Sequence, residues 1–255
     1  MTSEPDPTSV KLAERTGAHA TRCEVASTTR LSTSVIAIAL RGNAVALAGA
    51  PGNDVMIRLS DGNGRLVSRR YSVRDVDATN DELTLWVTVD HVGPGSTWVQ
   101  SATPGDEIDV IGPRGKIPLD PVADWHLFMG DISALAAAYR MAESIEVPGR
   151  VIFIIEIDAP DDALTATFDE GLGVTGIFVE RRGRDLKDPA GLLSGLAAFE
   201  LPPDLGHVYL FGEFHVVRTL VTAVTDRGVA PEQISHKPYW RSGLSNAEHG
   251  EPDKS

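Results

Sequence analysis

The sequence predicts two domains of different fold class, an antiparallel β-barrel in residues 21–119 and a parallel α/β domain in residues 120–245. In the first range, short strand-like runs recur about every 8–12 residues with few helical signals, which is typical of a barrel or a sandwich. In the second range, apolar runs alternate with helical stretches, which favours a parallel sheet flanked by helices. Residues 1–20 and 246–255 are polar and lack apolar periodicity, so we expect both to be disordered tails.

The barrel strands are predicted from runs in which apolar and polar side chains alternate. Leu83-Thr-Leu-Trp-Val-Thr-Val89 shows this alternation, which is the pattern of a strand with one buried face. The six predicted strands cover residues 22–28, 33–41, 54–59, 69–76, 83–89 and 107–111. Residues 112–118 are rich in Gly and Pro and form the predicted linker between the domains.

The α/β domain is predicted from short apolar runs that are followed by helical patterns. Val151-Ile-Phe-Ile-Ile155 is almost purely apolar, as expected of a strand that is covered on both faces. The predicted strands are residues 125–129, 151–155, 175–179 and 207–211, and the predicted helices are residues 133–146, 191–199 and 214–227.

Charge and cysteine content exclude several classes of protein. The chain has 23 basic and 36 acidic residues and a net charge of −13, so we expect neither nucleic acid nor an anionic membrane as a partner. Cys23 is the only cysteine, which excludes an intrachain disulfide and a cysteine metal cluster. The N-terminus lacks a secretory signal, and no apolar run approaches the roughly 20 residues that span a bilayer. We therefore expect a cytoplasmic, monomeric protein with no structural metal.

The tetrapeptide Arg69-Arg70-Tyr71-Ser72 lies in a predicted strand and combines cations, an aromatic ring and a hydroxyl. Positions 69 and 71 share one face of such a strand. A ring and a cation on that face could hold a flat cofactor and its phosphate. Taken alone, the tetrapeptide fits a solvent-facing, arginine-rich strand better.

A second unusual string is His91-Val-Gly-Pro-Gly-Ser-Thr-Trp98. Gly93 and Gly95 would let backbone N–H groups approach a phosphate, and a helix that begins near Ser96 would add a favourable dipole. The alternative is a plain turn in which Trp98 anchors the core.

Two strand ends in the second domain could bind a nicotinamide dinucleotide, because ligands of parallel α/β sheets bind at the carboxyl ends of the strands. Gly130-Asp131-Ile132-Ser133 follows the first of these strands, and Gly212-Glu213 follows a later one. The alternatives are an ordinary strand–helix turn and, for Glu213, a helix cap of the favourable charge sign.

The string His236-Lys-Pro-Tyr-Trp-Arg-Ser-Gly243 places two adjacent aromatic residues between cations near the C-terminus. It could cover a flat cofactor or form a C-terminal strand that packs on the core.

Arg181, Arg182 and Arg184 form another basic group, for which an exposed charged turn is the preferred interpretation. The chain contains neither HExxH nor GxSxG, which leaves a metallohydrolase or a serine hydrolase almost without support.

Each motif is weak alone, but their order and spacing are specific. From about Arg22 to Leu244 the chain resembles the siderophore-interacting proteins, flavin-dependent ferric-siderophore reductases of the ferredoxin-reductase superfamily. The family's motifs are matched by Arg69, Tyr71 and Ser72; by His91, Gly93, Pro94, Gly95, Ser96 and Trp98; by residues 112–115; and by Tyr239, Trp240, Arg241 and Gly243.

The resemblance implies a Greek-key-like flavin-binding barrel followed by a nucleotide-binding-like α/β domain, in an enzyme that reduces ferric siderophores and releases Fe(II). It implies no catalytic side chain, because the flavin carries the electrons. The expected FAD-binding residues are Arg69, Tyr71, Ser72, His91, Gly93, Gly95, Ser96, Trp98, Tyr239 and Trp240. The residues expected to bind the electron donor, which is NADH, NADPH or a ferredoxin, are Gly130, Asp131, Ser133, Gly212 and Glu213. Lys237 and Arg241 are the expected contacts of an anionic ferric siderophore.

Departures from the family pattern cluster in the second domain. Ile132 replaces a glutamate, Ala136 replaces a proline and Phe211 replaces a tryptophan. These departures leave the identity of the electron donor open. Two alternative functions therefore remain: a general NAD(P)H-dependent flavin or ferric reductase, and a non-enzymatic binding or regulatory protein that has lost donor binding.

Overall fold

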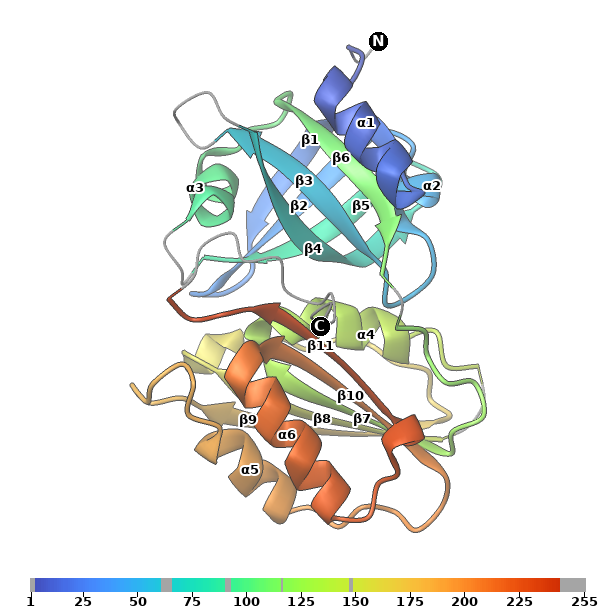
Figure 1. The fold of residues 1–255 in the computed structure, drawn as a ribbon, viewed down its shortest axis with the longest axis vertical. Helices are drawn as coiled ribbons and strands as arrows, with labels where there is room; N and C mark the ends of the chain where they lie inside the picture. The colour runs from blue at the N-terminus through green and yellow to red at the C-terminus, as the bar shows by residue number, and fades with distance from the viewer. Residues whose placement is uncertain (1–2, 61–65, 90–92, 116, 147–148, 244–255) are drawn as a thin grey trace. The chain divides into compact units, whose positions relative to one another are not determined.

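The computed structural model describes residues 3–60, 66–89, 93–115, 117–146 and 149–243 (Figure 1). The chain divides into two compact units, residues 1–118 and 119–255. Each unit has its own sheet and its own hydrophobic core, and each is described by itself.

The first unit is a closed barrel of six strands, in which every neighbouring pair is antiparallel. The strands are β1 (His19–Arg30), β2 (Val35–Arg41), β3 (Asp54–Ser60), β4 (Leu66–Asp77), β5 (Glu82–Thr88) and β6 (Glu107–Arg114), in the order β1-β2-β5-β4-β3-β6. The last strand closes the barrel by pairing with both β1 and β3. The predicted antiparallel barrel is therefore confirmed.

Alternation along the strands builds the barrel core. In β5, Leu83, Leu85 and Val87 are buried, while the side chains between them are partly exposed, as the two-residue period predicts. Cys23 lies inside this core, and burial raises the pKa of its thiol to about 12. A short helix, α2 (Ala44–Ala48), adds its fully buried Leu47.

An N-terminal helix corrects one expectation. Residues 1–20 were expected to be disordered, but Pro7–Thr16 form α1, and β1 begins at His19. The carboxylate of Asp6 accepts a hydrogen bond from the backbone N of Thr8 at 2.7 Å, and Pro7 stands at the first helical position. Aspartate before proline is a helix-start signal, and the polar composition of the segment obscured it. Residues 246–255 lie outside the described residues.

Buried groups tie α1 to the barrel. Ala13 packs with Met56 and Ile111, which are buried under the helix. The carboxylate of Asp109 accepts hydrogen bonds from Ser9 Oγ at 2.7 Å and from the backbone N of Asp6 at 2.9 Å. The exposed side chains of α1 explain why its sequence looked like a tail, and these few inward contacts explain why it folds.

The second unit is a five-stranded parallel sheet with helices. Its strands are β7 (Trp125–Asp131), β8 (Gly149–Ile157), β9 (Leu172–Glu180), β10 (Gly206–Glu213) and β11 (Ile234–Trp240), in the order β11-β10-β7-β8-β9. Its helical segments are η1 (Ile132–Ala134), α4 (Leu135–Ala142), η2 (Pro160–Asp162), α5 (Ala190–Ala197), α6 (Phe214–Asp226) and η3 (Pro231–Gln233). This confirms the predicted α/β class, and β11 fits the alternative of a C-terminal strand.

Both faces of the central strands are covered, because every residue of β7 and of β10 is buried. Leu192 of α5 and Leu220 of α6 share one apolar cluster with Leu127 and Leu210 of the sheet. On the opposite face of the sheet, Tyr139 of α4 meets the ring of Phe153 edge-on, with 5.1 Å between ring centroids. The strand order reverses between β7 and β10, which makes their carboxyl ends the switch point where ligands of such sheets bind.

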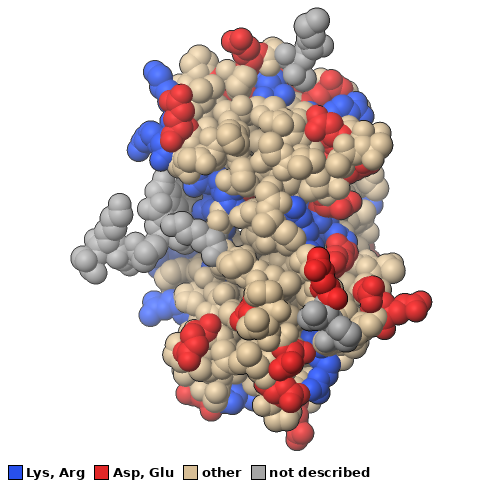
Figure 2. Space-filling view, turned by 90° about the vertical axis from the view of Figure 1, so that its right-hand side faces the viewer, with Lys and Arg blue, Asp and Glu red and all other residues tan. Residues whose placement is uncertain are grey.

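The surface carries charges of both signs. Figure 2 shows basic and acidic side chains interspersed over one face of the molecule. Within the part of the chain that the structure describes, no helix has the length and apolar character needed to cross a bilayer.

Candidate functional site

Strand β4 presents Arg69 and Tyr71 on one face. Val67 lies two residues before Arg69 on the same face, and Val73 lies two residues after Tyr71. Both valines are buried in the barrel core, and Tyr71 packs against that core. Arg70 belongs to the opposite face, where its guanidinium makes two contacts with the Asp54 carboxylate at 3.1 and 3.0 Å. Alternation therefore separates Arg69 and Tyr71 from the neighbouring cation.

The start of helix α3 (Pro94–Ser101) lies directly against this face. A Cβ atom at Gly95 would overlap the hydroxyl of Tyr71 and would lie 3.5 Å from Cγ of Arg69. Glycine is therefore required for the helix start to approach the strand this closely. The ring centroids of Trp98 and Tyr71 lie 6.5 Å apart. Four of the predicted FAD residues therefore come together: Arg69, Tyr71, Gly95 and Trp98.

The remaining predicted FAD residues have different surroundings. Gly93 is the N-cap of α3, with open space around its Cα, and Ser96 donates a hydrogen bond to the carbonyl of Val89 at 3.3 Å. Ser72 alternates onto the other face of β4. His91 lies outside the described residues. Tyr239 and Trp240 belong to the second unit.

Electrostatics make Arg69 an anion-binding candidate. Its guanidinium donates to the carbonyl of Ser68 at 2.8 Å, but it has no carboxylate partner within the described ranges. Partial burial lowers its pKa, because desolvation disfavours the charged guanidinium. Burial also raises the pKa of Tyr71, so its hydroxyl stays protonated and can donate a hydrogen bond. An unneutralised cation, a hydroxyl donor and a helix start suit the phosphates of a dinucleotide such as FAD.

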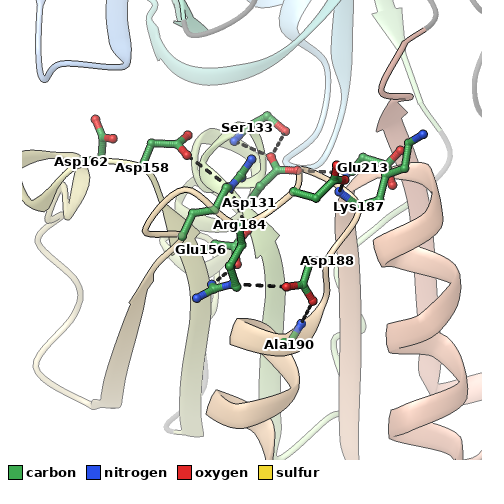
Figure 3. Close-up of polar contacts among 12 residues, drawn as sticks. Asp131, Ser133, Glu156, Asp158, Asp162, Arg184, Lys187, Asp188, Ala190 and Glu213 are labelled. Atoms are coloured by element: carbon green, nitrogen blue, oxygen red, sulfur yellow. Dashed lines mark hydrogen bonds and ion pairs between the residues drawn. The ribbon is translucent and has the colours of Figure 1, made fainter.

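At the switch point of the second unit, Asp131 is a hydrogen-bonding hub with 6% exposure (Figure 3). Its Oδ1 accepts from the backbone N and the Oγ of Ser133, at 2.9 and 2.5 Å. Its Oδ2 accepts from the backbone N of Glu213 and from Nε1 of Trp240, each at 3.0 Å. The carboxylate therefore joins the ends of β7, β10 and β11.

Glu213 is buried beside it and caps α6. Its carboxylate accepts hydrogen bonds from the backbone N of His215 and, at 3.1 Å, of Val216. Its other oxygen accepts from the backbone N of Ser242 at 3.2 Å. The cap that the sequence offered as an alternative is thus present, and the same carboxylate also holds the chain that follows β11.

The two glycines of this edge permit close packing. A Cβ atom at Gly130 would overlap the carbonyl oxygen of Phe211, and one at Gly212, where φ is +120°, would overlap the carboxylate of Asp131. The five predicted donor residues therefore lie together where β7 and β10 end, and they are engaged with one another or with neighbouring strands. The residues that depart from the family pattern here are apolar and buried: Ile132 is 5% exposed, and Phe211 stacks on Tyr239 with 5.1 Å between ring centroids.

A buried ion network follows along the same edge, at the ends of β8 and β9. Glu156 lies 3.0 Å from Nε of Arg181 and 2.7 Å from Nη2 of Arg184, and Asp188 lies 3.8 Å from Arg184 (Figure 3). Burial raises the pKa of Glu156 despite these cations. The expected exposed turn is wrong for Arg181, which is 4% exposed, because β9 carries it to the carboxylate of Glu156.

Sequence reasoning missed Glu156, although a lone carboxylate at the end of an apolar strand was an available signal. An open hollow of about 380 Å³ adjoins the network. Its lining includes Arg182, Arg184, Gly191 and Ser194.

The C-terminal string places cations over aromatic rings. Nζ of Lys237 lies 5.7 Å from the ring centroid of Tyr239, and the guanidinium carbon of Arg241 lies 4.9 Å from that of Phe214. In the described parts of the chain, no three His, Cys, Asp or Glu side chains are grouped to hold a metal ion.

A closed antiparallel barrel followed by a parallel five-stranded sheet defines the ferredoxin-reductase-like fold, which solved ferredoxin reductases share. Residues 60–117 match the model of the siderophore-interacting FAD-binding domain, and residues 123–243 match that of the siderophore-interacting proteins. The chain belongs to the siderophore-interacting protein family. The match to the FAD-binding domain also supports FAD as the cofactor of the barrel.

Relatives and solved structures agree with this assignment. An uncharacterized protein of Mycobacterium tuberculosis is 32% identical over 69% of the chain and 65% of its own length, so the chain spans just under two thirds of that relative. The ferric vibriobactin reductase of Vibrio cholerae is 27% identical over 72% of the chain and 68% of its own length. The crystal structure of a siderophore utilization protein from T. fusca superposes with a TM-score of 0.80 and 25% identity, covering 91% of this chain and 96% of that one.

Proposed function

We propose that this chain is a flavoprotein that reduces ferric iron held by a siderophore and so releases Fe(II). The observation that carries the proposal is the convergence of Arg69, Tyr71 and Gly95 on one face of the barrel. The ferric vibriobactin reductase among the relatives acts on the same class of substrate. FAD, when bound, supplies the electron transfer, and the protein supplies its orientation and its surroundings.

Each barrel residue has a separable role in this proposal. Arg69 binds a phosphate oxygen, because it is a partly buried cation of β4 that has no carboxylate partner among the described residues. Backbone N–H groups at the start of α3 bind the same anion, and Gly95 lets them approach. The Tyr71 hydroxyl donates a hydrogen bond to the cofactor, and its ring supports a flat surface. Ser72, His91, Gly93, Ser96 and Trp98, with Tyr239 and Trp240, complete the proposed contacts.

The electron donor is NADH, NADPH or a ferredoxin, and we place a nicotinamide donor at the edge formed by Gly130, Asp131, Ser133, Gly212 and Glu213. The Asp131 and Glu213 carboxylates already accept hydrogen bonds from within the protein there, so neither carboxylate is free to bind the donor in this arrangement.

Lys237 and Arg241 attract the anionic ferric chelate, which is the substrate. Iron leaves because Fe(II) matches hard anionic oxygen ligands less well than Fe(III). We place the protein in the cytoplasm, as a monomer.

One observation favours a second candidate, a non-enzymatic binding protein on this fold. Both carboxylates of the proposed donor edge are engaged internally, and the nearby departures Ile132 and Phe211 are buried and apolar. Anaerobic mixing of the flavin-loaded chain with NADH, NADPH and reduced ferredoxin separates the two candidates. Bleaching of the flavin by any of them supports the reductase, and bleaching by none supports the binding protein. A general flavin or ferric reductase would reduce free flavin or simple iron salts as fast as ferric siderophores.

The cofactor site is tested by titrating FAD into the purified chain. Arg69→Ala should weaken binding by about 1.5–3 kcal/mol, the contribution of a charge-assisted hydrogen bond. Arg41→Ala is the matched control, since it removes one barrel cation from an exposed ion pair with Glu82. Equal FAD affinity in the two variants would contradict the placement of Arg69, and a chain that binds no FAD would exclude both reductase candidates.

A further inference from the structure

The two edge strands of the parallel sheet, β11 and β9, differ in their protection against other chains. An edge strand offers unpaired backbone groups to a second chain, and charged side chains and proline discourage that pairing. Strand β11 carries both, as Lys237 and Pro238. Strand β9, Leu172–Glu180, contains neither lysine nor proline, and its one charged residue, Glu180, stands at its end.

The first half of β9 is open to solvent. Residues 173–176 are all exposed, although they are small or apolar, and Val174 is one of the exposed large hydrophobic side chains. Among the described residues, β9 pairs with β8 and with no other strand. Its outer edge is therefore a flat, uncharged template for another strand.

The pairing with β8 fixes which backbone groups of β9 point outward. The backbone N of Arg181 donates to the carbonyl of Ile157 on β8 at 2.8 Å. Backbone groups of successive residues point to opposite edges of a strand, so the odd-numbered positions of β9 face β8. The N–H and C=O groups of Val174, Gly176 and Phe178 consequently point away from the sheet.

The two ends of β9 carry exposed charges of opposite sign. The chain enters the strand through Asp169 and Glu170, which are exposed, and leaves it through Arg182, which is 77% exposed. The ion pair of Arg182 with Glu180 is itself exposed and therefore weak. An antiparallel copy of this strand would bring the carboxylates at the start of each strand to the Arg182 cation at the end of the other. A parallel copy would place like charges together.

Charge also selects the register of such a pair. A twofold axis at Gly176 sets Val174 opposite Phe178 of the second copy and brings Glu170 toward Arg182 of that copy. An axis at Thr175, one residue earlier, would bring Glu170 toward Glu180 of the second copy, and like charges opposite each other destabilise a strand pair. A glycine-rich strand specifies its register weakly by its side-chain pattern, so the end charges decide it.

We propose that the outer edge of β9 binds the same edge of a second copy of this chain, antiparallel and with the twofold axis at Gly176, so that the two sheets become one. A single pair of strands gives an interface smaller than those of stable dimers, so the dimer forms only at high concentration. The monomer of the proposed function is its dilute form. This inference goes beyond the proposed function and depends on neither the cofactor nor the chelate.

The test is sedimentation velocity of the full chain from about 1 μM to about 1 mM, a range that covers the Kd values of weak complexes. The mean sedimentation coefficient should rise with concentration. Gly176→Lys sets two lysines directly opposite each other at the axis and should raise the dimer Kd about tenfold or more. Gly176→Ala is the matched control at the same position, because its Cβ atom would lie in ordinary contact with the Phe178 ring at 3.7 Å and adds no charge.

Charge reversal tests the antiparallel register. Glu170→Arg and Arg182→Glu should each raise the dimer Kd about fivefold, because each change acts twice in a twofold dimer. The double variant should return to within about twofold of the unmodified chain, since the opposite charges face each other again. Both residues are exposed, so these variants decide the question even if Gly176→Lys does not fold.

The proposal is overturned if the unmodified chain stays monomeric over the whole concentration range. It is also overturned if Gly176→Lys associates as strongly as Gly176→Ala, which would place the contact on another surface. Absence of rescue in the double charge variant would refute the antiparallel pairing through Glu170 and Arg182.

Discussion

The indole Nε1 of Trp240 donates a hydrogen bond of 3.0 Å to Oδ2 of Asp131, which lies 109 residues earlier in the chain. The bond joins the end of β11 to the end of β7, and β10 lies between these two strands. The same carboxylate oxygen accepts the backbone N of Glu213. One buried side chain thus sets the positions of three strand ends at the switch point, where the donor and the chelate are proposed to bind.

Asp131→Asn should destabilise the second unit by about 2 kcal/mol. The amide keeps the shape of the carboxylate, but its NH₂ group must face either the donors of Ser133 or those of Trp240 and Glu213, which leaves buried donors unsatisfied. Urea unfolding measures the loss. In a Trp240→Phe background the penalty should shrink, because one of the opposed donors is gone, and an unchanged penalty would contradict the role given to the indole.

Gly95→Ala should weaken FAD binding about tenfold or more. The added methyl group would overlap the Tyr71 hydroxyl, and relief requires the ring or the helix start to move, at a cost of about 1–3 kcal/mol. Gly176→Ala, on β9 of the other unit, is the control, because a Cβ atom there meets only the Phe178 ring at 3.7 Å, an ordinary van der Waals contact, and its φ lies outside the left-handed region. Fluorescence titration of FAD compares the two variants.

Tyr71→Phe tests this contact in a double-mutant cycle. Alone it should weaken FAD binding, because the hydroxyl is a proposed hydrogen-bond donor to the cofactor. Removing the hydroxyl also opens the space that the methyl group added by Gly95→Ala needs, so the losses of the two single variants should be less than additive in the double variant. Additive losses would show that the glycine acts through something other than its approach to Tyr71.

Part of the barrel was predictable from alternation, because strands such as β5 show their buried face with a two-residue period. The same rule put Arg69 and Tyr71 on one face. Helix α1 was missed because the polar composition of the segment obscured its Asp6-Pro7 start signal, and because its buried contacts, such as Ala13 against Met56, join residues far apart in the sequence. No local pattern could have indicated those contacts.

The proposed donor-binding residues were likewise predictable only in part. The positions of Asp131 and Glu213 at strand ends followed from the predicted topology. The partners of their carboxylates did not, because Trp240 and Ser242 reach them only after β11 has paired with β10. Burial of Arg181 was also missed, since its carboxylate partner lies on another strand.

Adjacent arginines at the end of β9 should differ sharply in their effect on stability. Arg181→Ala removes a buried cation from Glu156 and should cost about 3 kcal/mol, since the carboxylate keeps only Arg184. Arg182→Ala removes a side chain that is 77% exposed and paired with Glu180, so it should change the free energy of unfolding by less than about 0.5 kcal/mol. Equal Tm values for the two variants would contradict the burial of the network.

Stability of the second unit should fall between pH 6.5 and about 4 because of His126. Its side chain is buried, stacks on Tyr209 with 6.0 Å between ring centroids, and leaves Nδ1 without a hydrogen-bond partner within the described residues. Burial, with the nearby charge of His207, lowers the pKa of His126 from 6.5 to about 4. Asp120 acts in the opposite direction, but its effect is smaller.

The sign follows from proton counting. Between pH 6.5 and about 4 the unfolded chain holds a proton on His126 and the folded chain does not, so lowering the pH favours unfolding. The contribution is fully present above pH 6.5 and amounts to about 3 kcal/mol once it is lost near pH 4. His126→Phe keeps an aromatic ring against Tyr209 and removes the titrating group. Urea unfolding across this pH range should give a flatter curve for the variant, and parallel curves would show that His126 is not the group that titrates.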